Sequence, residues 1–337
     1  MRQRFLLFIM MFTFLYTAKT WQMAHSIQRF SKYGEFFDSY VKMDVCCQNR
    51  RREELESVLE DVWTRFGDIN SRFSVYDPHS DINKINQAYN ASISVPEDTY
   101  ERIKNSLDYY KISNGVYDIT VEPLITLWKT RGQEGVMPTD EEIRQAMAKV
   151  DIKTISLLDN HRIRLTRPDV KINIDSIGDG FAADEAAKIL RSHGFSDFLV
   201  DASGEIYAGG HNCQGRKWRI GVQDPQDKEK IIDVIELSDM AVSTSGSYER
   251  FYEIDGKSWS HIIDPRSGYP ARGIVSATVV APSAELADFL STAFCILPAS
   301  ESLQIIDSFG KDHAAMLITE NEGKEQEVIS NGYNEFR

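Results

Sequence analysis

The chain contains only four cysteines in 337 residues, and no two of them form a C-x-x-C pair. This number is too small for a disulfide scaffold in a chain of this length, and the missing pair excludes the common zinc and dithiol motifs. Cys46 and Cys47 are neighbours that would point to opposite faces of a strand, so they suit neither mutual pairing nor a shared zinc ion. We therefore expect buried apolar thiols, with a single long-range disulfide as the alternative.

Positive charge is also scarce, since 38 Lys and Arg residues stand against 51 Asp and Glu residues, for a formal net charge of −13. Binding of nucleic acid needs clustered positive charge to displace counterions, so this balance argues against it. Anion binding stays open, because helix N-termini or a metal ion supply local positive charge. The composition, with 42% hydrophobic and 26% charged residues, excludes disorder over the whole length.

Long apolar runs are missing except at the N-terminus, where Arg2 and Arg4 precede the apolar run 5–16. A basic start followed by a short apolar run is the layout of an export signal, and a membrane span needs roughly 20 apolar residues. No clean A-x-A cleavage site follows. We expect an exported protein whose segment 1–24 is either removed or kept as a membrane anchor, with a buried core helix as the alternative.

No stretch rich in Pro, Gly or Ser separates two bodies, so we expect one unit over residues 34–337. The spacing of apolar residues predicts a strand over 36–47 and helices over 50–72, 96–114, 118–129 and 139–150. Short strands, including 170–174 and 198–201, follow from residue 153 on, with a small-residue helix over 284–297. The expected fold is α+β, a helix-rich N-terminal half packed on a mixed or antiparallel, sheet-rich C-terminal half, as one large domain or two lobes sharing a cleft.

The segment 258–270 is the most unusual one, because a strand ends in His261 and an Asp264-Pro265 turn and Gly268-Tyr269-Pro270 follow. Two prolines and a glycine make a stiff loop, and a His and an Asp held rigidly form a platform for acid and base chemistry. The alternative is that Asp264 caps the turn and His261 packs in the core.

Asp288 and Thr292 are four residues apart in an otherwise apolar helix, so their side chains lie on one face. A buried Asp needs a partner, and a hard cation suits a carboxylate beside a hydroxyl. Oxygen ligands favour Mg²⁺ over zinc. The alternative is a hydrogen bond from Asp288 to the backbone of a neighbouring loop.

The glycine-rich junction 175–180 joins a predicted strand to a predicted helix, whose N-terminus favours a phosphate. It lacks the Gly-Lys-Ser/Thr of a P-loop and is not G-x-G-x-x-G, so the common nucleotide folds lose support. Asp175 and Asp179 would repel a phosphate without a cation, which points to a metal-bridged phosphate; taken without the other segments, the junction is better explained as a plain glycine-rich turn. We expect the rings of Tyr76 and Tyr117 either to stack on a flat ligand or to pack in the core.

Together these segments resemble the FAD:protein FMN transferase family, the ApbE family, in order over 34–297. The resemblance rests on FSVYDPHSDINKIN (73–86), GVYDITVEPL (115–124), IGDGFAAD (177–184), STSGSY (243–248), HIIDPRSGYP (261–270) and APSA (281–284) leading to Asp288 and Thr292. It implies a single ApbE-like domain with a central flavin cleft. The sequence departs from the family pattern at Asn173, where many members carry Asp, and at Phe37-Asp38-Ser39, where Met-Gly-Thr is common.

The resemblance implies a Mg²⁺-dependent enzyme that cleaves FAD, releases AMP and places FMN on a Thr or Ser hydroxyl of a target protein through a phosphodiester. Implied targets are a subunit of the Rnf or Nqr complexes or a protein with an FMN-binding domain. Family members are exported, which implies a place on the periplasmic side of the inner membrane, with membrane association through segment 1–24. The alternatives are a Mg²⁺-dependent FAD pyrophosphatase that gives AMP and FMN, a non-catalytic FAD-binding surface protein, and a structural surface protein.

Site residues follow by the same resemblance. The implied metal ligands are Ser176, Asp288, Ser291 and Thr292. The implied FAD contacts, with the Tyr76 ring on the flavin, are Phe37, Tyr76, Val116, Tyr117, Asp118, Asn173, Asp179, Ser245, Tyr248 and Ile262. His261 is expected to help deprotonate the acceptor hydroxyl, a role that Asp288 or a metal-bound water would fill otherwise.

Overall fold

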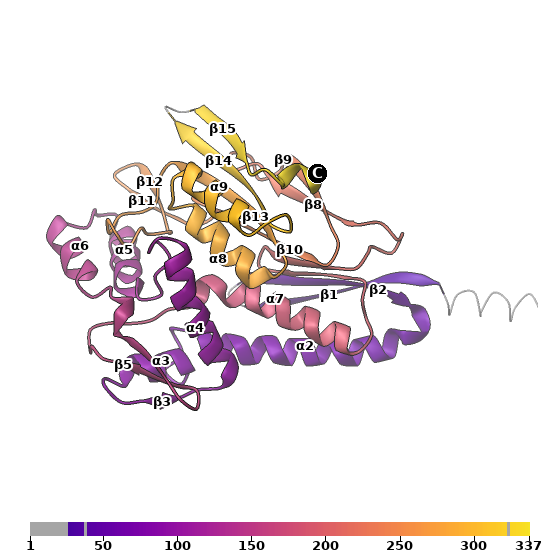
Figure 1. Ribbon diagram of the computed structural model, residues 1–337, viewed down its shortest axis with the longest axis horizontal. Coiled ribbons are helices and arrows are strands. Elements are labelled where there is room, and N and C mark those ends of the chain that lie inside the picture. The colour runs from indigo at the N-terminus through magenta and orange to yellow at the C-terminus, as the bar shows by residue number, and fades with distance from the viewer. Residues whose placement is uncertain (1–25, 37–38, 322–323) are drawn as a thin grey trace, which may run out of the picture.

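An eight-stranded sheet organises the chain, in the strand order β1-β2-β6-β7-β10-β13-β14-β15 (Figure 1). The computed structural model describes residues 26–36, 39–321 and 324–337, so segment 1–24 and Phe37 lie outside the described residues. Every neighbouring pair of strands is antiparallel, which confirms the predicted α+β class. The strands are β1 Ile27–Phe36, β2 Ser39–Gln48, β6 Phe198–Ala202, β7 Glu205–Gly209, β10 Met240–Gly246, β13 Ile274–Ala281, β14 Ala314–Asn321 and β15 Lys324–Ile329.

Smaller sheets and the helices surround this sheet. The short strands are β3 Ile93–Ser94, β4 Ile155–Leu158, β5 Arg162–Leu165, β8 Trp218–Gln223, β9 Ile231–Leu237, β11 Phe251–Ile254 and β12 Lys257–Ser260. The helices are α2 Arg52–Phe73, α3 Asp81–Gln87, α4 Glu97–Ile112, α5 Glu122–Glu134, α6 Asp140–Met147, α7 Asp175–Ser192, α8 Ala284–Phe294 and α9 Ala299–Ser308, with short 3₁₀ turns η1 Asn49–Arg51, η2 Ile152–Thr154 and η3 Tyr333–Glu335. Within the described ranges, none of the helices is long and apolar enough to cross a membrane.

The large sheet is covered on both faces. Helices α7 and α8 pack on one face, with α2 beside α7 (Figure 1), and the β8–β9 pair packs on the other. Successive residues of β10 divide between the two cores, Ala241 beneath the helices and Val242 beneath β8–β9. Because both faces are buried, central strands such as β13 are apolar along almost their whole length.

A separate apolar cluster holds the 261–270 loop in place. Leu124, Trp128 and Ile143 of α5 and α6 pack there with Ile254 and Ile263. The Trp128 Nε1–H donates a hydrogen bond of 2.8 Å to the carbonyl of Gly268, whose φ of +76° is the left-handed conformation that glycine tolerates best. This loop is therefore fixed from outside by a buried indole.

Two predicted elements are wrong in extent or kind. The helix expected over 118–129 begins only at Glu122, because the Asp118 carboxylate accepts hydrogen bonds from the amide and hydroxyl of Thr120 and holds a turn instead. The strand expected over 170–174 is not formed. Ile172 pairs with the Asn86 side chain through bonds of 2.8 and 2.9 Å, so an amide replaces the partner strand.

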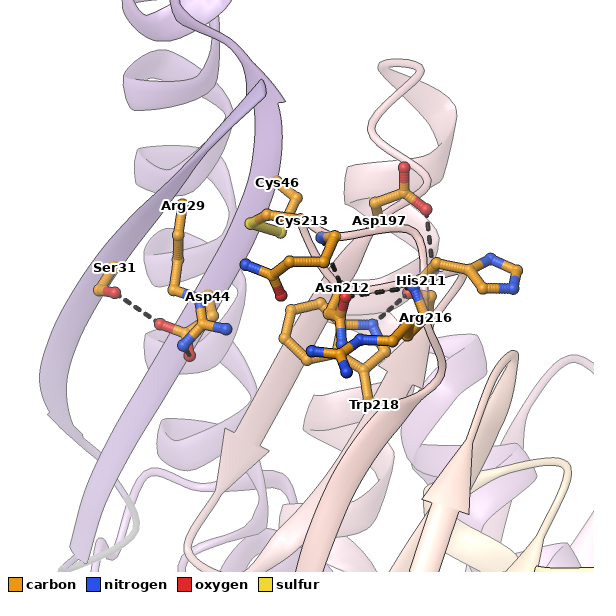
Figure 2. Close-up of a disulfide and its surroundings, with 12 residues drawn as sticks. Arg29, Ser31, Asp44, Cys46, Asp197, His211, Asn212, Cys213, Arg216 and Trp218 are labelled. Carbon is orange, nitrogen blue, oxygen red and sulfur yellow. Dashed lines mark hydrogen bonds and ion pairs between the residues drawn. A yellow bond between two sulfur atoms is a disulfide. The ribbon is translucent and has the colours of Figure 1, made fainter. Parts of the chain in front are cut away.

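The expectation of free thiols is wrong for two of the four cysteines. Cys46 on β2 forms a disulfide with Cys213 in the loop between β7 and β8 (Figure 2). Cys47 and Cys295 are free and buried. Cys46 and Cys47 point to opposite faces as expected, since one packs in the β8–β9 core and the other beneath the helices. A separation of 167 residues hides this pairing in the sequence.

Hydrogen bonds support the same loop from both sides of the disulfide. Asp197 accepts a bond of 2.9 Å from the His211 amide, and the Asn212 side-chain amide donates one of 3.1 Å to the Lys217 carbonyl. The Trp218 Nε1–H donates to the Gly209 carbonyl at 2.9 Å. The disulfide thus joins an ordered loop to the sheet (Figure 2).

Loss of the Cys46–Cys213 bond is expected to lower the free energy of unfolding by about 2–4 kcal/mol, because the bond restricts a long loop of the unfolded chain. Urea unfolding with and without a reductant measures the loss. The double variant Cys46→Ser/Cys213→Ser is the control, and it should unfold at lower urea and stop responding to reductant. Equal stability of the oxidised and reduced protein would contradict the expectation.

Candidate active site

Two side chains, Ser283 and Asp184, hold the first turn of α8. The Ser283 hydroxyl caps the helix by accepting a bond of 3.2 Å from the Leu286 amide. Asp184 of α7 accepts bonds of 2.8 and 3.0 Å from the amides of Ala284 and Glu285. These bonds satisfy the free N–H groups of the helix start and fix α8 relative to α7.

Asp288 lies one turn further along α8, where the two helices approach most closely. A Cβ added to Gly180 would stand 2.6 Å from the Ala284 carbonyl oxygen, so only glycine fits at this point of α7. The Gly180 amide donates a bond of 3.2 Å to Asp288 Oδ2. The Asp288 side chain is 6% exposed. Its burial raises its pKa well above the usual value, and the charges of Glu205 and Asp179 raise that pKa further.

Ser291 and Thr292 follow Asp288 on α8, and the Ser245 hydroxyl of β10 contacts both of their hydroxyls; we call Asp288, Ser291, Thr292 and Ser245 the carboxylate–hydroxyl cluster. The Ser291 hydroxyl donates to the Asp288 carbonyl at 3.0 Å and lies 2.8 Å from the Ser245 hydroxyl. Ser245, on β10, is also 3.3 Å from the Thr292 hydroxyl. Thr292 shares a helix face with Asp288. The structure thus brings together three implied metal ligands and one implied FAD contact.

Ser176 enters this region from the first turn of α7, four residues before Gly180 and hence on the same helix face. Its hydroxyl shares a hydrogen bond of 2.9 Å with the Tyr117 hydroxyl. Tyr117 is buried, as is Val116, and its ring meets Phe289 of α8 edge-on. Burial raises the pKa of Tyr117, and the charge of Asp288 adds to that increase. The implied ligands of α7 and α8 therefore belong to one region.

Other implied FAD contacts line the neighbouring segments. The Asn173 amide nitrogen donates a bond of 2.7 Å to Glu122, which ties the approach to α7 to the start of α5. The buried Asp118 carboxylate serves the turn described above. Tyr76 is 71% exposed, and Lys129 lies 4.8 Å from its ring centre and donates to its hydroxyl. The Tyr76 ring is thus presented to solvent, whereas Asn173 and Asp118 take part in the framework.

His261 lies at the end of β12, against the turn that follows β10. Its Nδ1 is 2.9 Å from the Arg250 carbonyl oxygen. A carbonyl only accepts, so Nδ1 carries the proton and Nε2 keeps a free lone pair. Burial lowers the pKa of His261 below its usual value, and the Arg250 charge lowers that pKa further. The imidazole is therefore neutral near pH 7 and able to accept a proton.

Two further implied FAD contacts are Ile262, which follows His261 in the chain, and Tyr248, in the turn after β10. Ile262 is buried, and its carbonyl accepts a bond of 2.8 Å from the Ala271 amide. The Tyr248 ring lies so close over Gly246 that a Cβ there would stand 2.3 Å from it, and burial raises the Tyr248 pKa to about 12. A hollow of about 500 Å³ adjoins the same loop, but none of the predicted site residues line it. Its lining is Trp259, Asp264, Ser267, Tyr269, Pro270, Ala271, Arg272 and Ile296.

The donor set around Asp288 fits a hard cation. In the part of the chain that the structure describes, no three His, Cys, Asp or Glu side chains group into a metal site. Mg²⁺ uses one or two carboxylates and completes its shell with water and substrate phosphate, so a mixed set of carboxylate and hydroxyl oxygens suits it. The cluster itself offers only oxygen atoms, which disfavours zinc, and the neighbouring Cys295 thiol donates to the Ser245 carbonyl at 3.4 Å. Asp288 and Thr292, with Ser176 from α7, are the residues that would hold magnesium.

Gly180, Asp184 and Glu205 were not among the site residues expected from the sequence. Gly180 and Asp184 belong to a motif that was noted, but only the packing of two helices reveals why glycine and a carboxylate stand there. Glu205 begins β7 and is 9% exposed, although a Glu at the start of an apolar strand is usually solvated. The signal available in the sequence was this acid directly ahead of Ile206-Tyr207-Ala208.

Gly180→Ala is expected to lower the free energy of unfolding by about 1–3 kcal/mol, because its methyl group would push α8 away from α7. Gly178→Ala is the matched control in the same helix. The nearest atom to its added Cβ is 3.6 Å away, an ordinary contact, so better helix propensity should raise stability by up to about 1 kcal/mol. Urea unfolding of both variants compares them, and equal stability changes would contradict the close helix contact.

A family sequence model and individual relatives both match this chain. The sequence model of the ApbE family matches residues 37–317. The Escherichia coli K12 protein named FAD:protein FMN transferase is 32% identical over 265 residues, which cover 76% of this chain and 75% of that protein. The Salmonella typhimurium protein of the same name is 30% identical over 81% of this chain and 79% of its own length.

Solved structures agree with the fold. The flavin transferase ApbE from Vibrio cholerae superposes with a TM-score of 0.82 over 92% of this chain and all of that chain, at 24% identity, which speaks for the fold alone. The ApbE protein from Thermotoga maritima superposes with a TM-score of 0.82 at 31% identity, over 92% of this chain and 99% of that chain. Since the family model matches most of its length and relatives named FAD:protein FMN transferase are 30% or more identical to it, this chain belongs to the ApbE family.

Proposed function

We propose that this chain is a magnesium-dependent transferase that cleaves FAD, releases AMP and attaches FMN through a phosphodiester to a Thr or Ser hydroxyl of another protein. The curated relatives carry the name of this transfer. The observation that carries the proposal is the buried carboxylate of Asp288 on the same helix face as Thr292, whose hydroxyl lies 3.3 Å from that of Ser245. A buried carboxylate with oxygen neighbours is suited to a divalent cation, which a reaction at a pyrophosphate requires.

Magnesium, when bound, would neutralise charge on the pyrophosphate and polarise the bond that breaks. The protein itself carries a net charge of −13, so its average field does not attract such an anion. Asp288 and Thr292 would hold the cation from α8, and Ser176 would add an oxygen from the start of α7. The Ser291 hydroxyl orients the Ser245 hydroxyl and also donates a hydrogen bond to the Asp288 carbonyl.

His261 accepts the proton of the acceptor hydroxyl at Nε2 in this proposal. The Arg250 carbonyl fixes the tautomer by holding the Nδ1 proton. Burial keeps the imidazole neutral, which is the form that a general base needs at neutral pH. The indole of Trp128 fixes the loop that follows, so the ring is held in place before substrate arrives.

FAD would contact the segments around this cluster. The exposed Tyr76 ring stacks on the flavin. The remaining proposed contacts are Phe37, Val116, Tyr117, Asp118, Asn173, Asp179, Ser245, Tyr248 and Ile262. Because several of these residues also maintain turns and helix starts, binding of FAD requires little rearrangement of the backbone.

The transfer takes place outside the cytoplasm in this proposal, on the periplasmic side of the inner membrane. The basic and apolar residues at the N-terminus support export, with segment 1–24 removed or kept as an anchor. The Cys46–Cys213 disulfide supports the same compartment, since disulfides persist where the surroundings are oxidising. The acceptor is a flavoprotein such as an Rnf or Nqr subunit or a protein with an FMN-binding domain.

The transfer is tested by incubating the protein with FAD, MgCl₂ and a recombinant FMN-binding domain as acceptor. The acceptor should gain the mass of FMN less water while AMP appears in solution, as mass spectrometry and chromatography record. Asp288→Ala should abolish both products because it removes the carboxylate ligand, whereas Asp307→Ala, on the exposed side of α9, should leave both unchanged. AMP without added mass on the acceptor would show a pyrophosphatase instead.

His261→Ala is expected to slow transfer roughly 100- to 10,000-fold and to leave FAD binding largely intact, because it removes a proton acceptor. The wild-type rate should fall as the pH is lowered through a pKa below 6.5, since protonation at Nε2 blocks the base. His211→Ala, on the exposed disulfide loop, is the control and should keep the wild-type profile. Fluorescence titration with FAD separates the roles, and lost binding would make His261 a binding residue.

A further inference from the structure

Glu205 is a buried acid with one oxygen left without a partner. It is the first residue of β7 and is 9% exposed. Its Oε2 is fully buried and makes no hydrogen bond, while the Ser243 hydroxyl of the neighbouring strand β10 bonds to the carboxylate. Burying a carboxylate oxygen away from water is costly unless another group compensates for its charge. A bound cation would compensate for the charge of this unpartnered oxygen.

No basic side chain supplies that compensation within the described ranges, where Glu205 forms no ion pair with Lys or Arg. The charges that act on it belong to Asp179, Glu249 and Asp201, all negative, and together with burial they raise its pKa. This protein pairs another buried acid, Glu285, fully. The Arg102 guanidinium lies 3.1 Å from the Glu285 carboxylate. That carboxylate also accepts hydrogen bonds of 3.0 Å from the Tyr109 hydroxyl and the Asn105 amide.

Glu205 and Asp288 face one region from opposite layers. Strand β7 packs against α8. The Ser243 hydroxyl that meets Glu205 lies 2.8 Å from the Ser291 hydroxyl, which in turn bonds to the Asp288 carbonyl. Among neighbouring charges, Glu205 has the largest influence on the pKa of Asp288. Glu205 therefore approaches the carboxylate–hydroxyl cluster from the sheet, while Gly180 approaches it from α7.

We propose that Glu205 is a second carboxylate of the divalent-cation site and binds the cation through Oε2 from the sheet side. Asp288 and Thr292 bind the same cation from α8. The inference rests on the proposed magnesium dependence. Two carboxylates match the charge of one divalent ion, and magnesium is commonly bound through one or two carboxylates with water and phosphate in the remaining positions. The cation compensates for the charge that the protein leaves unpaired at Glu205.

The test measures cation binding by the full chain without FAD, using Mn²⁺ as the probe and electron paramagnetic resonance of the free ion as the readout. Glu205→Gln keeps the shape but removes the charge, and it should weaken Mn²⁺ binding about tenfold or more. Glu285→Gln is the matched control, because it neutralises an equally buried acid that has its own partners, and its affinity should stay within about twofold of wild type. Wild-type affinity in Glu205→Gln would overturn the inference.

Two further variants separate this inference from the proposed function. Loss of binding in Asp288→Ala together with wild-type binding in Glu205→Gln would refute the role of Glu205 and leave the magnesium site standing. No Mn²⁺ binding by wild type, with or without FAD, would refute both. Thermal unfolding checks the fold of each variant. If Glu205→Gln does not fold, Glu205→Asp decides, because a carboxylate shortened by one carbon should bind Mn²⁺ more weakly than wild type, and unchanged affinity would overturn the role.

Discussion

The close approach of α7 to α8 is the constraint on which the rest of the site depends. At Gly180 the two backbones come too near for any side chain, and this nearness lets a backbone amide reach the Asp288 carboxylate. Asp184 satisfies the start of α8 from the same helix. The apolar core beneath both helices then needs small residues, which explains the run of alanines in α7. The close helix contact that positions the Asp288 carboxylate therefore also determines which residues the core can contain.

Much of the fold could be predicted from the sequence, because apolar periodicity reports burial directly. The helices α2, α4 and α8 follow from it, as do the strands of the large sheet other than β1, which was not predicted. Prediction failed where a side chain replaced a backbone partner. Asn86 takes the place of a strand beside Ile172, and Asp118 holds a turn where a helix was expected. A long-range disulfide was only the alternative expectation, and the pairing of Cys46 with Cys213 was not predicted, because proximity in space leaves no trace in a single sequence.

The candidate site was predictable to a different degree. Residues that occur in ordered motifs, such as His261 and Asp288, could be named without coordinates. Glu205 could not, because what distinguishes it is a buried carboxylate oxygen without a hydrogen-bond partner, and no sequence motif indicates this. Asp184 was hidden for the opposite reason, since its carboxylate is fully engaged by amides far along the chain. Sequence thus identifies chemical groups, whereas packing identifies the groups that hold them or oppose their charge.

The disulfide has a mechanical consequence for the edge of the sheet. Strands β1 and β2 form the N-terminal edge, and a force on the residues before β1 would tend to peel this hairpin away one hydrogen bond at a time. The Cys46–Cys213 bond ties the end of β2 to the loop ahead of β8 (Figure 2), so a covalent link stops such peeling at Cys46. A load applied through the N-terminus is thereby passed to the outer layer before it reaches α2.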